Sequence, residues 1–261
     1  MVKVKQKAAE NYIKFLGTAG ARFVMIKQLR ASGGIWISAS GANILIDPGP
    51  GSIVRCASSR PKLDPGILDA IILTHRHLDH ANDINVMIEA MTEGGFKKRG
   101  VVFCPRDALD NDPVILKYAQ GLPEKIELLA ENKIYRAGNF EFETSMRLKH
   151  PVETYGLKFK INDKVVALLT DTKYFKGLED FFSGVDLLII CVVFLEPHPA
   201  IEHLSLKEAE QLIGELKPRK AVLTHFGMTM LNAKPYIQAQ DLTKKLGIEV
   251  VAAQDGEKLI W

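Results

Sequence analysis

Apolar runs that stop at a polar or charged residue recur along the whole chain, and they predict its β-strands. The strands expected from these runs are Ile13–Leu16, Gly34–Ser40, Ala42–Asp47, Ala70–Ile72, Gly100–Cys104, Glu141–Leu148, Leu157–Ile161, Val165–Thr170, Asp186–Val193, Lys220–Thr224, Glu249–Ala252 and Lys258–Trp261. Apolar and other residues alternate along Gly34–Ser40, whereas Ala42–Asp47 is nearly all apolar. Because Gly41 separates these two segments, we expect them to form a β-hairpin.

Helical spacing of apolar residues predicts three helices. In the first, apolar residues recur at positions i, i+3, i+4 and i+7, namely Ile84, Met87, Ile88 and Met91. Asn82 is its candidate N-cap, and two glycines at 94 and 95 its candidate stop.

The other two helices are marked by their ends. Ser205 and Glu208 match a capping box that starts Leu206–Leu216, and Gly247 closes Gln238–Leu246.

The region Pro105–Ala130, which precedes these two helices, has mixed secondary-structure signals. We expect short helices and loops there, in a region that shapes access to a site.

Composition places the chain among globular proteins. Of its 261 residues, 47% are hydrophobic and 25% charged, which excludes a disordered chain. No linker or composition shift interrupts it, so we expect one domain over residues 1–261. Strand-rich halves followed by helices indicate an α/β protein in which two sheets pack face to face with helices outside.

Charge and cysteine content narrow the function classes. A net charge of +3 is too small to indicate a nucleic-acid-binding surface, although it suits an anionic substrate. The three cysteines are far apart and are expected to be reduced packing residues. Met1–Tyr12 has no apolar core of signal-peptide length, and no run approaches the ~18 apolar residues of a membrane span. We therefore expect a cytoplasmic protein without a membrane partner.

Metal-capable side chains cluster in Leu73-Thr74-His75-Arg76-His77-Leu78-Asp79-His80, directly after an apolar strand. Residues two apart in an extended chain point the same way, so His75 and His77 can bind one ion. Asp79 and His80 follow where the chain must turn, and they can reach a second ion. The alternative interpretation is a polar loop without a metal-binding role. However, a chain with 7 histidines in 261 residues rarely has three of them within six positions by chance. Imidazole with carboxylate suits zinc, iron or manganese rather than calcium or magnesium.

Three strands end in the same way, with a threonine followed by a metal-capable residue. The residues after threonine are His75, Asp171 and His225, and His150 also follows a predicted strand. Ligands in open sheets gather beyond strand ends, so this repetition predicts a composite metal site. Asp47, in the turn Asp47-Pro48-Gly49-Pro50-Gly51, is either a turn residue or a partner that orients a metal ligand.

The ordered set of Asp47, His75-x-His77-x-Asp79-His80, His150, Asp171 and His225 resembles the signature of the metallo-β-lactamase superfamily. The resemblance covers about residues 13–251. It implies a four-layer αββα sandwich and two divalent metal ions, with zinc preferred and manganese or iron as alternatives. It further implies that His75, His77 and His150 bind one ion, that Asp79, His80 and His225 bind the other, and that Asp171 bridges both. A bridging hydroxide would be the nucleophile. An imidazole rather than a carboxylate at His77 favours hydrolysis over the oxygen reduction of flavodiiron-type relatives.

The segment around His203 is similar to the ribonuclease Z and cyclic-phosphate diesterase branch. In that branch a histidine at this place assists the leaving group, so Asp79 and His203 are the candidate catalytic residues, with His203 as general acid. The alternative is that His203 is a loop histidine capping backbone groups. His198, between two prolines, is expected to be an irregular-loop residue.

A small or cyclic phosphodiester, a nucleotide or an RNA end is the expected substrate. The long Gly/Pro-rich arm that grips tRNA in true ribonuclease Z is missing from this sequence, which favours a small substrate. Hydrolysis of a thioester, lactone or β-lactam is the alternative on the same metals, and a non-catalytic metal-dependent sensor the third. Relatives in this branch often form homodimers, and no residue here tests that expectation.

Overall fold

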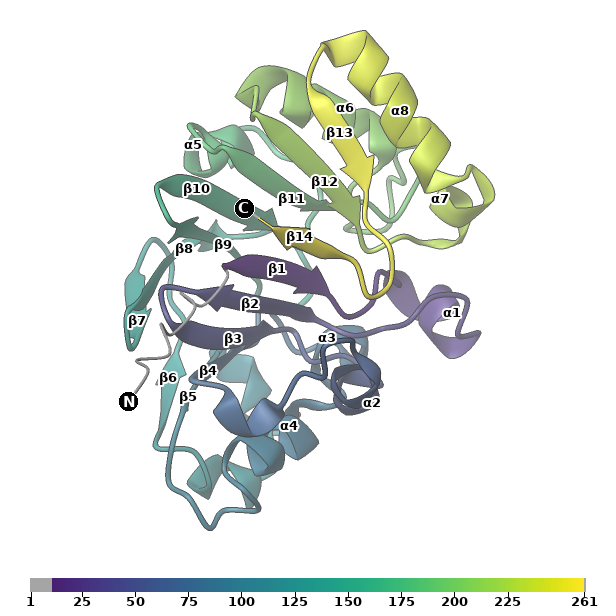
Figure 1. The fold of residues 1–261 in the computed structure, drawn as a ribbon. Helices are drawn as coiled ribbons and strands as arrows, with labels where there is room; N and C mark the ends of the chain where they lie inside the picture. Colours follow the sequence, from purple (N-terminus) through teal and green to yellow (C-terminus); the bar gives the residue numbers. More distant parts are fainter. Residues whose placement is uncertain (1–10, 261) are drawn as a thin grey trace.

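The computed structural model describes residues 11–260, whose strands form two seven-stranded sheets (Figure 1). The first sheet, in spatial order, consists of β14 (Lys258–Ile260), β1 (Tyr12–Phe15), β2 (Ile35–Ala39), β3 (Ala42–Ile46), β4 (Ala70–Ile72), β5 (Val101–Cys104) and β6 (Lys125–Leu128). The second consists of β13 (Glu249–Ala252), β12 (Lys220–Thr224), β11 (Leu187–Cys191), β10 (Lys164–Leu169), β9 (Tyr155–Ile161), β8 (Phe140–Arg147) and β7 (Ile134–Ala137). The first ten residues of the N-terminal segment and Trp261 of the last predicted strand lie outside the described residues.

Helices cover the outer faces of both sheets. The helices of residues 11–260 are α1 (Ala21–Ile26), α2 (Ser52–Ser58), α3 (Leu78–Ala81), α4 (Ile84–Met91), α5 (Leu178–Phe182), α6 (Leu206–Leu216), α7 (Met228–Asn232) and α8 (Pro235–Leu246). Helices α2, α3 and α4 lie on the first sheet, and α5, α6 and α8 on the second (Figure 1). Short 3₁₀ turns occur at Pro65–Ile67, Arg106–Ala108 and Ala119–Gly121.

Alternate residues of the central strands enter different apolar layers. Ile35 and Ile37 of β2 pack between the sheets with Ile189 of β11, whereas Trp36 packs outward under the helices of the first sheet. Ile190 likewise packs under the helices of the second sheet. Because both faces of these strands are buried, they are almost continuously apolar. Three apolar layers separate four layers of secondary structure, which confirms the expected αββα sandwich.

Parallel pairing brings several strand ends to one edge. Strands β3 to β6 are parallel, and so are β10 to β13. The β2–β3 hairpin is also confirmed, with Ser40 at φ 54° and Gly41 at φ 80° in its two-residue turn. The carboxyl ends of the parallel strands therefore present the segments that follow them at a common edge of each sheet.

The structure differs from the prediction at some helix ends. Asp83 rather than Asn82 precedes α4, which ends at Met91. Strand β6 lies inside 105–130, where short helices and loops were expected, and α8 starts earlier than Gln238. Among residues 11–260, none of the helices combines the length and the apolarity needed to cross a bilayer.

Candidate metal centre

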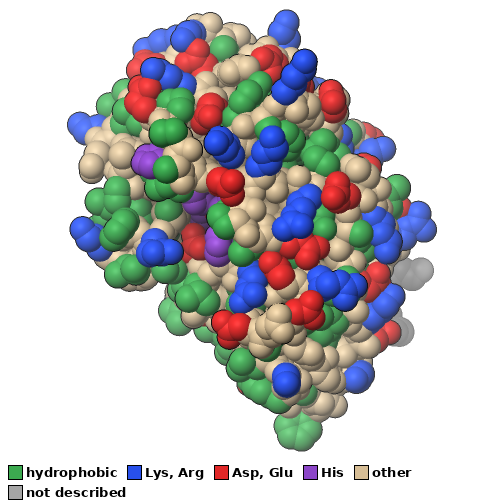
Figure 2. Space-filling model, turned by 180° about the vertical axis from the view of Figure 1, so that it is seen from behind, with side chains coloured by type: hydrophobic (Ala, Val, Ile, Leu, Met, Phe, Trp, Pro, Cys, Tyr) green, Lys and Arg blue, Asp and Glu red, His purple; other side chains and the backbone are tan. Residues whose placement is uncertain are grey.

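Most of the histidines lie together in a hollow of one face of the molecule. Figure 2 shows their side chains recessed there, with hydrophobic, lysine and arginine side chains around the opening. The residues come from segments that follow strand ends. His75 comes after β4, Asp171 after β10, and His225 directly after β12. The structure therefore brings together the residues that the strand-end pattern selected.

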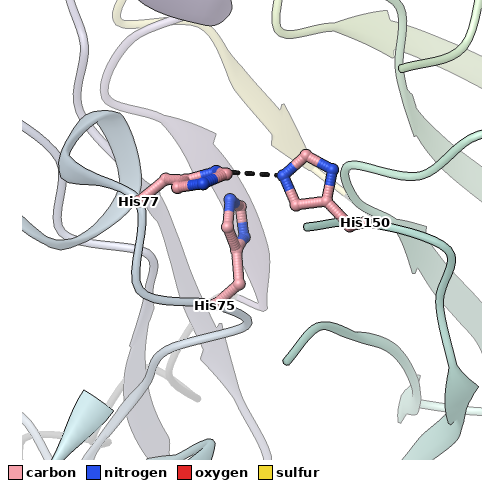
Figure 3. A group of neighbouring side chains, drawn as sticks. All are labelled: His75, His77 and His150. Carbon is pink, nitrogen blue, oxygen red and sulfur yellow. Dashed lines mark hydrogen bonds between the residues drawn. The ribbon is translucent and has the colours of Figure 1, made fainter. Parts of the chain in front are cut away.

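Three imidazoles form the first cluster, which we name the imidazole group: His75, His77 and His150. Their candidate ligand atoms lie within 4.8 Å of one another. The ring centroids of His75 are 5.0 Å from those of both other histidines, and the three rings converge (Figure 3). The Nε2 atom of His150 lies 2.9 Å from Nδ1 of His77.

A second cluster, the carboxylate group, contains Asp79, His80, Asp171 and His225. The Nε2 atoms of His80 and His225 lie 3.4 and 3.3 Å from Oδ2 of Asp171. The Nε2 atom of His225 is also 3.5 Å from Oδ2 of Asp79. Two imidazoles thus face two carboxylates in a small space.

Asp171 lies between the two groups. Its Oδ2 is also 3.7 Å from Nε2 of His75, so one carboxylate approaches both clusters. Neither oxygen of Asp171, nor Nε2 of His75, has a hydrogen-bond partner, although these atoms are fully enclosed. The imidazole nitrogens around Asp171 thus lie close to its carboxylate without forming hydrogen bonds to it. This arrangement is typical of ligand atoms that all point at one metal position between them. Buried polar atoms without partners are costly, and metal binding would compensate that cost.

The far nitrogens of the imidazoles fix their orientation. Nδ1 of His150 donates to the backbone carbonyl of Glu202 at 2.9 Å, and Nδ1 of His80 donates to Oδ2 of Asp47 at 3.0 Å. The Thr74 hydroxyl donates to Asp47, which leaves its oxygen to accept from Nδ1 of His75 at 3.1 Å. Because Nδ1 of His75 and of His150 carries the proton, the Nε2 atoms of these two rings present lone pairs to the centre, and Nε2 of His80 can do so once that ring is neutral. Asp47 therefore has the orienting role that the sequence left as one of two alternatives.

Backbone geometry holds the ligand segments close to each other. His225 has φ 60° and Asp47 has φ 51°, both in the left-handed region that residues with a side chain seldom adopt. A Cβ on Gly20 would lie 1.9 Å from the carbonyl oxygen of His225. The glycine-rich turn before α1 therefore packs directly against the segment of a candidate ligand, and the Ala21 N–H faces Nε2 of His225 at 3.4 Å.

Electrostatics differ between the two groups. Burial, followed by repulsion from neighbouring imidazoles, lowers the pKa of His75 well below its usual value and that of His77 to about 4. Burial also lowers the pKa of His150. Burial acts in the same direction on His80, but Asp79 and Asp47 outweigh it and raise the pKa of that ring. The imidazole group is therefore neutral at neutral pH, whereas the carboxylate group holds a cationic ring.

His203 lies beside the centre. Its ring is 5.1 Å from that of His150, and its Nδ1 is 3.5 Å from Oδ2 of Asp171 without a hydrogen-bond partner. Burial lowers its pKa, but the carboxylate of Asp171 outweighs burial, and the pKa is raised. The expected capping box of α6 is present, with the Ser205 hydroxyl accepting from the Glu208 N–H. The capped helix end thus fixes the segment that carries His203.

Two further contacts involve the segment after β5. Arg76 donates to the carbonyl of Asp112 at 2.6 Å, and Asp107 accepts from the N–H of Glu153 at 3.0 Å, so the segment after β5 is tied to two ligand segments. Its role in substrate access stays a prediction. His198 lies in an irregular loop, as expected, and its ring stacks on Phe194 with centroids 5.2 Å apart, a contact that the sequence did not predict.

Comparisons with known proteins agree with this geometry. A family model described as a β-lactamase superfamily domain matches residues 42–226. An uncharacterized protein of Methanocaldococcus jannaschii is 31% identical over 258 residues, covering 95% of this chain and 94% of that protein. A ribonuclease Z of Thermococcus kodakarensis is 27% identical over 64% of this chain and 52% of its own length. The crystal structure of the metallo-β-lactamase fold protein YhfI of Bacillus subtilis superposes with a TM-score of 0.79 at 22% identity, covering 96% and 99% of the two chains.

Proposed function

This chain belongs to the metallo-β-lactamase superfamily of metal-dependent hydrolases, and we propose that it hydrolyses a small or cyclic phosphodiester. The observation that carries the proposal is the position of His203. His203 is a sixth histidine beside the five of the candidate ligand set; its Nδ1 has no hydrogen-bond partner, and neither metal group needs it for completion. Such a residue suits the reacting end of a substrate. The similarity to a ribonuclease Z supports the same substrate class.

The donor set fits two divalent metals. His75, His77 and His150 would hold one, Asp79, His80 and His225 would hold the other, and Asp171 would contact both. Mixed imidazole and carboxylate ligation favours zinc, with manganese or iron as alternatives. The chemistry that two bound metals supply is acidification of a water molecule and neutralisation of charge on the phosphate.

The side chains of the protein supply orientation and a proton. Asp47 and the carbonyl of Glu202 hold two ligand rings with their Nε2 atoms turned inward. His203 gives a proton from Nδ1 to the oxygen of the departing alcohol as its bond to phosphorus breaks. The hydroxyl that replaces this oxygen on phosphorus comes from water. Proton donation of this kind contributes roughly 10²- to 10⁴-fold to a rate.

The expected substrate is small rather than a folded RNA. The sequence has no Gly/Pro-rich arm of the type expected to grip tRNA, and its net charge is only +3. A thioester, lactone or β-lactam remains the second candidate, because the same metals could activate water toward a carbonyl. That reaction would not require His203.

The test uses protein freed of metal and reloaded separately with zinc, manganese and iron. Turnover of phosphodiesters with a p-nitrophenyl and with an alkyl leaving group is measured beside a thioester and a β-lactam. We expect His203→Ala to lower alkyl diester turnover by about 10²-fold or more at unchanged metal content. The p-nitrophenyl diester should suffer much less, because its leaving group departs without a proton. Equal losses on both diesters, or cleavage of the thioester or lactam alone, would reject the proposal.

A further inference from the structure

The segment between β11 and α6 presents an aromatic stack beside His203. The rings of Phe194 and His198 are 5.2 Å apart with an interplanar angle of 26°. Phe194 also meets the ring of His203 edge-on, with centroids 6.2 Å apart. Phe194 is half-buried and His198 is exposed, so the outer ring of the stack has an open face.

This stack is fixed rather than free to rotate away. Prolines at 197 and 199 flank His198 and restrict the backbone on both sides. Phe194 is anchored by a bridge to Ser205, and its carbonyl accepts from the N–H of Leu206. A ring held in one plane loses little entropy when another ring stacks on it.

The position of the stack relative to the proton donor defines what it can contact. His203 stands where the proposed reaction protonates the departing alcohol. Ring contacts run from His203 to Phe194 and from Phe194 to the exposed His198. A group that reaches them from the site of protonation therefore belongs to that alcohol rather than to the phosphate. An exposed aromatic face favours a planar, weakly polar ring over a flexible chain.

We propose that Phe194 and His198 form a binding subsite for a planar aromatic ring carried by the leaving alcohol, as a nucleobase is carried by a nucleoside. His198 offers the stacking face, and Phe194 holds it in plane. This inference rests on the proposed phosphodiesterase function and specifies its substrate class. The natural substrate is then a phosphodiester whose leaving group is a nucleoside-like alcohol.

The experiment compares two diesters that differ only in their rings. One is a dinucleoside phosphate, and the other is the same diester with both bases replaced by hydrogen. We expect His198→Gln to lower kcat/KM for the dinucleoside phosphate roughly five- to a hundredfold, because stacking on an aromatic side chain contributes that much per base. Turnover of the base-free diester should be unchanged. His198→Phe, which restores a ring without its nitrogens, should recover the preference.

Further variants separate stacking from general damage. Phe194→Leu should lose the same preference while keeping apolar volume. Phe96→Leu is the matched control, because Phe96 is 94% exposed and lies in the turn before β5, at the amino end of that strand. A diester with a base on one sugar only shows by its products whether the base-bearing alcohol departs.

The outcomes distinguish this subsite from the reaction itself. Equal losses on both diesters in His198→Gln would mean that the stack merely positions His203, and unchanged preference in both His198→Gln and Phe194→Leu would also overturn the subsite. If wild-type protein cleaves neither diester, the proposed function fails, and binding decides the inference. Calorimetry with adenosine monophosphate and ribose 5-phosphate then either shows a base contribution that His198→Gln removes, or rejects the subsite.

Discussion

The imidazole group and the carboxylate group use similar ligands in opposite electrostatic surroundings. In the first, burial and mutual repulsion lower the pKa values of all three rings, so they present lone pairs at neutral pH. In the second, Asp79 and Asp47 raise the pKa of His80. The first group is therefore prepared for a cation, while the second keeps a proton until a metal replaces it.

The two groups also differ in the contacts that hold them together without metal. The carboxylate group is held together by contacts between His80, His225 and Asp171, whereas the imidazole group has one internal contact of 2.9 Å. Asp171 takes part in both, since burial raises its pKa but His225 and His203 outweigh burial and hold that pKa well below its usual value. The shared carboxylate is thus ionised with or without metal.

The largest effect is expected where the two groups meet. Asp171→Asn keeps the shape of the side chain but removes the charge that would lie between two cations. We expect loss of one metal equivalent and of several kcal/mol of transition-state stabilisation, about a thousandfold in rate. Elemental analysis of the reloaded protein and turnover of the alkyl diester measure these two losses. Far-UV circular dichroism showing native secondary structure in the metal-free variant is the control for folding. Two bound metals with normal turnover would contradict a bridging role.

A smaller effect is expected from a substitution that weakens metal binding by the carboxylate group more than by the imidazole group. Asp47 accepts a hydrogen bond from Nδ1 of His80, and in Asp47→Asn the amide can donate there instead and move the proton of that ring to Nε2. We expect the carboxylate group to lose roughly ten- to a hundredfold in metal affinity, as is typical when such a partner is lost. Titration with zinc against a competing chelator should show this loss for one metal and a smaller loss for the other, because Asp47 reaches His75 of the imidazole group only through the Thr74 hydroxyl. Asp69→Asn, at the amino end of β4, is the matched control, and equal weakening of both metals would count against the assignment.

Much of the site could be predicted because its residues follow apolar strands. Leu168-Leu169-Thr170-Asp171 shows the pattern, since a strand buried on both faces is nearly continuous in sequence and its end is sharp. The capping box at Ser205 was predictable for a similar reason, because both of its partners lie within three residues. Local patterns of this kind report the beginning and end of elements.

Elements without a one-sided apolar pattern could not be predicted. In α1, Phe23 and Ile26 are 63% and 64% exposed, so their spacing carries no helical signal. Strand β6 lies at the edge of its sheet and is only partly buried. The stacking of His198 on Phe194 depends on the path of an irregular loop, which no periodicity describes.

The smallest expected effect concerns acid and alkaline stability of the metal-free protein, where the two groups should act with opposite sign. The folded pKa of His77 is about 4 against 6.5 for the free side chain, so its contribution to stability is present above pH 6.5 and is lost as pH falls toward 4. For His80 the folded pKa is raised, so its contribution is present below pH 6.5 and is lost as pH rises through that raised value. Urea unfolding between pH 5 and 9 with a chelator should therefore show a weaker acid decline in His77→Gln and a weaker alkaline decline in His80→Gln. If both substitutions weaken the same decline, acid or alkaline, the electrostatic contrast between the two groups is wrong, even if both variants still bind metal.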